Sequence, residues 1–177
     1  MTAHVSREMK SLVLSICLAS ALTSVADTEP PGYSPDLYPV VQRAVAEVWR
    51  GMWGREPQPP KSFVMKVLSM FRFQRIDLNR DGQQEVIATT AELPETPNGD
   101  IFVFMRGKDG WTTIGAFDGY GGYTVTDEFV GGYRTIRTKH ADDPATYASF
   151  HVATYIFRGD RYEASTSKER ARDVSRN

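Results

Sequence analysis

The sequence predicts an α+β domain in which one N-terminal helix packs on a mainly antiparallel β-sheet of about six strands. Three observations predict this class. One segment has apolar residues at helical spacing, short stretches rich in β-branched and aromatic residues follow it, and each stretch ends at Gly, Asn, Asp or Pro. The chain has 177 residues, which leaves room for one ordinary domain and not comfortably for two.

The predicted helix runs from about Leu37 to Met52. Pro39 falls in its first turn, where a missing N–H breaks no hydrogen bond, and Gly51 and Gly54 mark its end. Its apolar residues recur three or four positions apart: Leu37, Val41, Ala44, Val45, Val48 and Met52. Because the opposite side is polar, we expect the helix to pack on the sheet rather than to lie on a membrane surface.

The predicted strands follow from Ser62 onward. They lie in the ranges 63–76, 85–90, 101–106, 111–117, 133–138, 149–157 and 162–164. The segments Gly107–Gly110 and Arg158–Arg161 are typical hairpin turns, each following an apolar strand and preceding an aromatic residue. The likeness of these two hairpins is a weak indication of duplication, and no repeat runs through the whole chain.

Residues 1–26 are predicted to be a signal peptide. Arg7 and Lys10 precede an uncharged apolar run, and small residues at Ser24 and Ala26 predict cleavage before Asp27. The run is about 16 residues long, whereas a membrane span needs about 20, so a retained anchor is the less favoured interpretation. A compact signal peptide also begins at Met9. We therefore expect a single domain over residues 27–164, a flexible polar tail over 165–177, and a periplasmic or secreted location.

Composition and charge exclude several classes of protein. Apolar residues make up 41% of the chain and charged residues 24%, which excludes a wholly disordered chain or a rod. The net charge of -1 argues against binding to nucleic acid. The only cysteine, Cys17, lies in the predicted signal peptide, so the mature chain has no disulfide and no cysteine-ligated metal.

The segment from Asp77 to Glu85 carries the strongest chemical signal. It reads D-x-N-x-D-G-x-x-E, with oxygen-bearing side chains at loop positions 1, 3, 5 and 9. Calcium takes six to eight hard oxygen ligands in loose geometry, Gly82 permits a sharp turn, and the Gln83 carbonyl can supply a further oxygen. The loop is not a complete EF-hand, because Ala88 stands where a bidentate Glu is required.

The stretch 76–87, IDLNRDGQQEVI, resembles the calcium loop of FG-GAP/VCBS-type repeats, which lies between two β-strands. The resemblance implies Ca²⁺ as the ligand, held by the side chains of Asp77, Asn79, Asp81 and Glu85 and by the backbone of Gln83. It covers about a dozen residues in one copy, so it implies a loop and not a β-propeller. The other interpretation is an Asp-Gly hairpin turn without a metal.

Two weaker signals concern catalysis and adhesion. His140, Asp142 and Asp143 lie together between predicted strands, and His151 follows on the next strand, so a His/carboxylate site is one interpretation. A solvated turn is the other, since no recognised catalytic motif is present. The tripeptide Arg158-Gly159-Asp160 is read by integrins, but turn chemistry explains it better.

Tyr120, Tyr123 and Tyr133 belong to a Gly/Tyr-rich region that we predict to be a partner-binding surface. Tyrosine on a loop offers rigid contact area with a polar tip, which suits a sugar or a protein. The other interpretation is that glycine serves the turns and tyrosine covers the edge of the core.

The sequence therefore predicts a periplasmic, calcium-binding, non-enzymatic binding module. One specific version is an inhibitor or immunity-type protein that acts on a cell-envelope hydrolase, with a protein or a cell-envelope glycan as partner and no membrane contact after signal cleavage. The alternative is a cell-wall or polysaccharide-acting hydrolase. Spatial convergence of acid–base groups in a cleft would favour the enzyme.

Overall fold

A computed structural model describes residues 30, 32–53, 60–90, 98–142 and 149–165. The described chain begins with a short 3₁₀ turn, Pro35–Leu37, followed by helices α2, Tyr38–Trp53, and α3, Lys61–Met70. Eight strands follow in these residues. They are β1 Arg72–Ile76, β2 Glu85–Thr89, β3 Asn98–Gly107, β4 Gly110–Tyr120, β5 Tyr123–Val130, β6 Tyr133–Ala141, β7 Phe150–Arg158 and β8 Arg161–Ala164.

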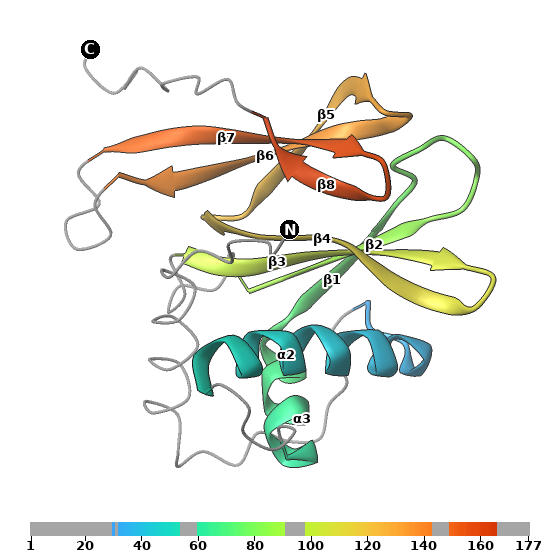
Figure 1. Ribbon diagram of the computed structural model, residues 1–177, viewed down its shortest axis with the longest axis vertical. Coiled ribbons are helices and arrows are strands. Elements are labelled where there is room, and N and C mark those ends of the chain that lie inside the picture. The colour runs from blue at the N-terminus through green and yellow to red at the C-terminus, as the bar shows by residue number, and fades with distance from the viewer. Residues whose placement is uncertain (1–29, 31, 54–59, 91–97, 143–148, 166–177) are drawn as a thin grey trace.

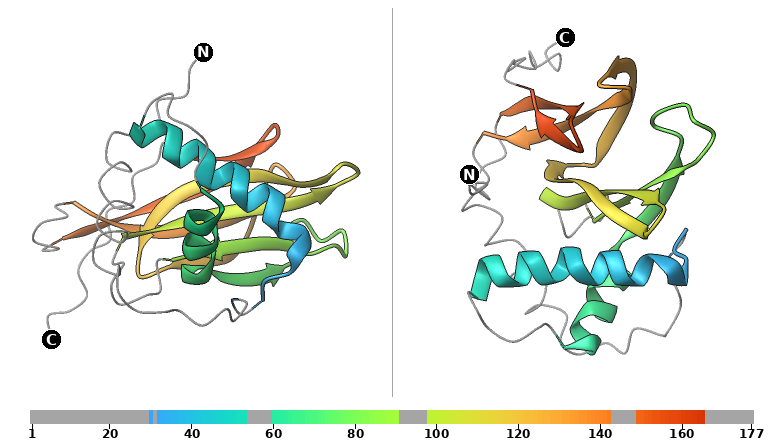
Figure 2. Two further views of the ribbon diagram at one scale, coloured as in Figure 1. Left: turned by 90° about the horizontal axis from the view of Figure 1, so that it is seen from below. Right: turned by 45° about the vertical axis from the view of Figure 1, so that its right-hand side comes forward.

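The strands form two separate sheets. Sheet A has the order β1-β2-β3-β4 and sheet B the order β5-β6-β7-β8, and every neighbouring pair is antiparallel. Each sheet is thus a simple meander in chain order. Figures 1 and 2 show three layers, with the helices on one face of sheet A and sheet B on its other face.

The predicted fold class is wrong. The molecule is mostly β, with two four-stranded sheets and two short helices in the described residues, and not one helix on a sheet of about six strands. Two local errors contributed. Residues 61–70 form α3 rather than a strand, because Val64 and Leu68 are buried four positions apart among good helix formers. The strand β5 was not predicted at all.

Several element predictions are confirmed. The predicted helix 37–52 corresponds to α2, and the two predicted hairpin turns join β3 to β4 and β7 to β8. The predicted signal peptide, residues 1–26, and nearly all of the predicted tail lie outside the described residues. None of the described helices combines the length and apolar composition that a bilayer crossing requires.

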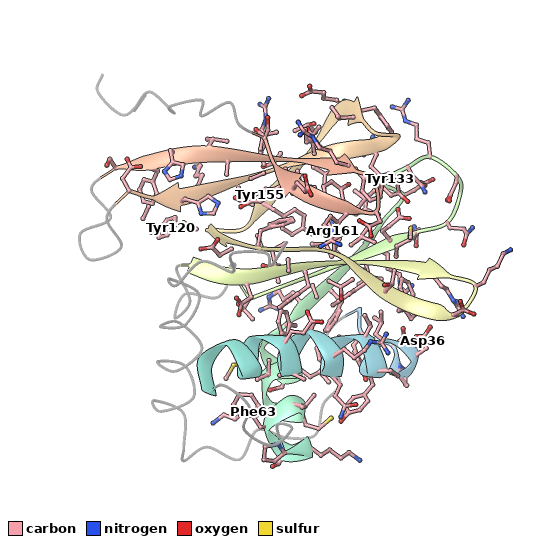
Figure 3. The ribbon with its side chains drawn as sticks, in the orientation of Figure 1. Asp36, Phe63, Tyr120, Tyr133, Tyr155 and Arg161 are labelled. Carbon is pink, nitrogen blue, oxygen red and sulfur yellow. The ribbon has the colours of Figure 1, made fainter. Side chains whose placement is uncertain are left out.

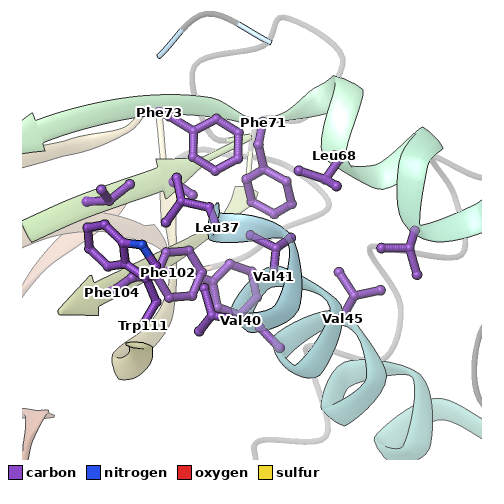
Figure 4. Close-up of a cluster of buried hydrophobic side chains, with 14 residues drawn as sticks. Leu37, Val40, Val41, Val45, Leu68, Phe71, Phe73, Phe102, Phe104 and Trp111 are labelled. Atoms are coloured by element: carbon purple, nitrogen blue, oxygen red, sulfur yellow. The ribbon is translucent and has the colours of Figure 1, made fainter. Parts of the chain in front are cut away.

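Sheet A is covered on both faces, and this divides the interior into two cores. The first core joins the helices to sheet A (Figure 4); Leu37, Val41, Leu68, Phe102 and Phe104 belong to it. The Trp111 indole N–H donates a 2.8 Å hydrogen bond to Asp36, which attaches the start of the helical layer to the β3–β4 hairpin. Successive residues of β3 alternate between the two cores, as the pleat of a strand requires.

The second core lies between the two sheets. The β1–β2 loop contributes Leu78, sheet A contributes Ile87, Ile101, Val103, Ile114 and Phe117, and sheet B contributes Ile136, Phe157 and Tyr162. Two glycines of β4 permit the close approach. A Cβ at Gly115 would lie 3.3 Å from the Tyr162 side chain, and one at Gly119 would lie 3.0 Å from that of Thr138. The sheets therefore pack over β4 at a distance that a larger side chain there would increase.

Candidate functional site

The segment Asp77–Gln84 connects β1 to β2, and Ile76 and Glu85 are paired across its base. The predicted placement between two strands is confirmed. Arg80 has a φ of 62° and Gly82 a φ of 84°. These left-handed residues turn the chain back on itself within a few positions, so the side chains of Asp77, Asn79 and Asp81 stay near the loop backbone.

Amide groups of the loop donate hydrogen bonds to several of its side-chain oxygens. The Gly82 N–H donates to Asp77 Oδ2 at 3.1 Å, and the Gln83 N–H donates to Asp81 Oδ1 at 2.7 Å. The Asp81 N–H donates to Asn79 Oδ1 at 3.1 Å, and the Asn79 amide donates to Asp81 Oδ2 at 2.9 Å. These bonds hold the wrapped conformation of the loop and leave each carboxylate with further lone pairs.

Glu85 is the deepest carboxyl of the loop, with an exposed fraction of 2%. Its Oε2 accepts a 2.8 Å hydrogen bond from the Leu78 N–H. Burial raises the pKa of Glu85, two backbone hydrogen bonds lower it, and the charges of Asp81 and Asp77 raise it further. Burial and the two aspartate charges therefore disfavour the ionised form of Glu85.

Asp77 Oδ1 is buried and accepts no hydrogen bond within the described part of the chain. A buried oxygen of this kind is destabilising by about 1–3 kcal/mol. A hard cation would satisfy it and would also offset the mutual repulsion of Asp77, Asp81 and Glu85. The donor set thus fits Ca²⁺ in chemical type and in charge.

The side chains are not gathered around one point. Among the described residues, no group of three or more His, Cys, Asp or Glu side chains is arranged to hold a metal ion. The hydrogen bonds above explain this arrangement, because the Asp77 and Asp81 carboxylates point to loop amides and Glu85 points to Leu78. The calcium site therefore stays a prediction.

The three tyrosines predicted to bind a partner are half-buried; Tyr120 and Tyr123 flank one turn, and Tyr133 lies apart from Tyr120. Figure 3 shows Tyr120 and Tyr133 toward opposite ends of the sheets. Tyr120 lies against Phe150, with ring centroids 4.7 Å apart. The Tyr123 hydroxyl donates a 2.5 Å hydrogen bond to Gln74, and the Tyr133 ring stacks on Phe157 at 3.9 Å. These contacts attach all three rings to the fold.

The structure brings His140, His151 and Asp142 together, whereas Asp143 lies outside the described residues. The two imidazole rings are stacked, with centroids 5.4 Å apart. His151 Nδ1 lies 2.7 Å from Asp142 Oδ1, and His140 Nε2 lies 2.7 Å from the buried Thr138 hydroxyl. The two histidines face each other because residues 140 and 151 are register partners on β6 and β7.

Sequence reasoning missed three members of this cluster. His140 Nδ1 lies 3.6 Å from Asp118 on β4, so the cluster links sheet B to sheet A. Asp100 pairs with Asp118 across β3 and β4, and burial, followed by the Asp118 charge, raises the pKa of Asp100 to about 6. Burial also raises the pKa of Tyr155 to about 12. A charged residue at the end of an apolar strand, as Asp100 and Asp118 are, was the available signal.

The Arg158-Gly159-Asp160 tripeptide forms the predicted turn. Gly159 has a φ of 65°, and Asp160 Oδ1 pairs with the Arg161 guanidinium at 3.1 Å.

A scan against protein-family models finds no match for the chain, and no curated protein matches its sequence.

Proposed function

We propose that the protein is a calcium-binding, non-enzymatic binding module of the cell envelope. The observation that carries the calcium assignment is the buried oxygen of Asp77, which lacks a hydrogen-bond donor beside the buried carboxylate of Glu85. An Asp-Gly turn by itself needs neither group buried. The residues that would hold the ion are Asp77, Asn79, Asp81, the Gln83 carbonyl and Glu85.

Calcium bound there would supply positive charge and a fixed geometry. The loop residues themselves hold the backbone conformation. Asp77 and Asp81 already hold the backbone of the turn, and Glu85 holds the Leu78 amide at the base of the loop. The role we assign to the ion is therefore structural: it fixes the connection between β1 and β2.

The proposed partner is a protein or a cell-envelope glycan. Its contact surface on this chain is the turn Tyr120–Tyr123, where the chain passes from sheet A to sheet B. Gly121 and Gly122 both have positive φ values there, and Tyr120 and Phe150 place two half-buried aromatic rings side by side. Adjacent rings with polar neighbours suit either partner. Inhibition of a cell-envelope hydrolase is the specific form that we put to the test.

The test uses immobilised full-length chain and a periplasmic extract, with calcium in one arm and chelator in the other. A protein identified by mass spectrometry should be retained only with calcium and lost with Tyr120→Ala. Met65→Ala is the control, because it removes an exposed apolar side chain from α3, outside the proposed contact surface. Sedimentation with purified peptidoglycan tests the glycan. If neither partner binds the wild-type chain, the binding function is wrong.

The proposal also predicts inhibition. A hydrolase captured in this way should clear a suspension of cell walls more slowly when the purified chain is added, and Tyr120→Ala should restore the rate. An unchanged rate would reject the inhibitor role while leaving a binding role in place.

A second candidate is the cell-wall hydrolase, and one observation favours it. Asp142 lies within hydrogen-bond distance of His151 Nδ1, which is the arrangement that orients an imidazole as a general base. Purified chain should then clear peptidoglycan by itself, with activity lost in His151→Asn and kept in Lys139→Gln, which removes an exposed charge from the neighbouring strand β6. No clearing by wild-type protein would reject this candidate.

A further inference from the structure

The loop between β1 and β2 contacts sheet B as well as sheet A. Its residues Leu78, Asn79 and Arg80 each reach one residue of the segment 129–134, where β5 turns into β6; we call this segment the β5–β6 turn. Figure 1 shows the green β1–β2 loop and this end of sheet B on the same side of the molecule. The candidate calcium loop is thus a structural bridge between the two sheets.

Leu78 makes the central contact of the bridge. Its side chain is fully buried in the core between the sheets, and its carbonyl accepts a 2.8 Å hydrogen bond from the Arg134 N–H. Its own N–H donates to Glu85 Oε2 at 2.8 Å. One peptide segment therefore connects a candidate ligand, Glu85, to the backbone of β6.

Asn79 and Arg80 add two side-chain contacts. The Asn79 amide lies 3.3 Å from the Tyr133 hydroxyl, which in turn donates to Met105 Sδ at 3.0 Å. The Arg80 guanidinium carbon lies 4.2 Å from the centre of the Phe129 ring. Arg80 has a left-handed backbone, so this cation–π contact depends on the wrapped form of the loop.

Candidate ligands and bridging residues are interleaved along the loop. Asp77, Asn79 and Asp81 would face the ion, Leu78 and Arg80 contact sheet B, and Asn79 does both, since its amide also contacts Tyr133. We propose that calcium binding in this loop fixes the β5–β6 turn against sheet A. Binding of the ion at the β1–β2 loop would then strengthen the packing of sheet B on sheet A. This inference rests on the proposed calcium function and goes beyond a local structural role for the ion.

The coupling must be reciprocal, because two linked binding equilibria change each other by the same factor. Calcium should strengthen the docking of the β5–β6 turn. Conversely, a weaker docking contact outside the ligand set should lower the calcium affinity. These two consequences are measured independently.

Hydrogen exchange of the Arg134 amide measures the first consequence. This amide donates to Leu78, so an opening of the bridge exposes it. In full-length protein at a hundredfold excess of calcium over Kd, an opening that releases the ion becomes up to about a hundredfold rarer, and Arg134 exchange slows by that factor. The Asp142 amide, which donates to the Ser149 carbonyl at the other end of β6, is the internal control and should not respond. Asp81→Asn should remove the calcium effect at Arg134.

Calorimetric titration with calcium measures the second consequence. Arg80→Asn removes the guanidinium and keeps a residue that tolerates a left-handed backbone, so the fold should survive. Loss of an exposed cation–π contact should weaken calcium binding roughly threefold. Arg158→Asn removes an exposed arginine from the β7–β8 turn and should leave the affinity unchanged.

The outcomes separate the two proposals. Slower Arg134 exchange with calcium, together with a lower affinity in Arg80→Asn alone, supports the coupling. Calcium binding with unchanged Arg134 exchange and unchanged affinity in Arg80→Asn overturns the coupling and leaves the calcium site standing. No calorimetric signal from wild-type protein overturns both.

Discussion

Asp100→Asn should make the protein more stable at neutral pH. Asp100 lies beside Asp118 on the neighbouring strand, and burial together with that charge raises the pKa of Asp100 from 3.8 to about 6. A group whose folded-state pKa is raised contributes stability below its unfolded pKa and loses it as the pH rises through the folded pKa. The contribution is therefore complete below about pH 4 and lost above about pH 6.

The magnitude follows from the same pKa values. A rise of about two pKa units at about 1.4 kcal/mol each makes the ionised Asp100 unfavourable by about 3 kcal/mol, an upper figure because the residue is only partly buried. Asparagine keeps the shape and removes the charge. At pH 7.5 the free energy of unfolding of Asp100→Asn should exceed that of wild type by up to about 3 kcal/mol. For a domain of this size that is a rise of roughly 10 °C in melting temperature.

The assay is thermal and urea unfolding of both proteins between pH 4 and pH 7.5. The stability difference between variant and wild type should grow over this range and then level off. Asp109→Asn is the control, since it removes an exposed carboxylate from the β3–β4 turn and keeps turn chemistry. A difference that stays constant from pH 4 to pH 7.5, or that matches the Asp109→Asn control, would refute the reasoning.

Three further predictions follow from individual contacts. In Glu85→Gln, urea unfolding in chelator should occur at the wild-type midpoint or later, while the stabilisation by calcium should be lost; an equal calcium response in both proteins would remove Glu85 from the ligand set. Leu78→Ala deletes a fully buried side chain from the core between the sheets and should lower the free energy of unfolding by about 3–5 kcal/mol; a loss below about 1 kcal/mol would contradict that burial. Gly131→Ala and Gly159→Ala share a φ of 65°, but a Cβ at Gly131 would lie 2.2 Å from the Phe157 carbonyl oxygen, while one at Gly159 meets nothing within 4 Å. Backbone strain should lower the free energy of unfolding of both variants by about 1–2 kcal/mol, and the contact with Phe157 should lower that of Gly131→Ala further. Equal losses would show that the β5–β6 turn moves away from Phe157 without cost.

Local patterns predicted the elements whose signal is complete in the sequence. The helical spacing of Leu37, Val41 and Val45 found α2, and Gly-Asp turn chemistry found the β3–β4 and β7–β8 hairpins. The strand β5 was missed because none of its residues is fully buried, and its pairing with β6 is irregular between Val125 and Phe129. A strand of this kind lacks the alternation of buried and exposed residues on which sequence reasoning depends.

The division into two sheets could not be read from the sequence. It occurs at Gly121 and Gly122, and a Gly-Gly pair between two strands is typical of a hairpin as well as of a change of sheet. The glycines that let the sheets approach, Gly115 and Gly119, lie inside β4, where a pattern search finds only weaker strand residues. Fold class therefore depended on tertiary packing that no local pattern encodes.

The same limit applies to the candidate site. The spacing of oxygen-bearing residues located the loop and its place between two strands, because both are local properties. The contacts of Leu78 and Arg80 with β6 and β5 join residues about 50 positions apart. Likewise, the Asp118–His140 contact depends on how the two sheets face each other. Sequence reasoning found the loop and the two histidines and could not find their contacts with the other sheet.

Thermal unfolding of the full-length chain in calcium, in magnesium and in chelator tests the central claim most directly. Calcium binds the folded loop and not the unfolded chain, so a hundredfold excess over Kd should stabilise the protein by about 2.7 kcal/mol. Magnesium should do less, because it demands tighter octahedral geometry and holds its waters. Asp81→Ala should unfold identically in all three conditions. Coincident wild-type curves in calcium and in chelator would contradict the calcium site and leave an Asp-Gly turn between β1 and β2.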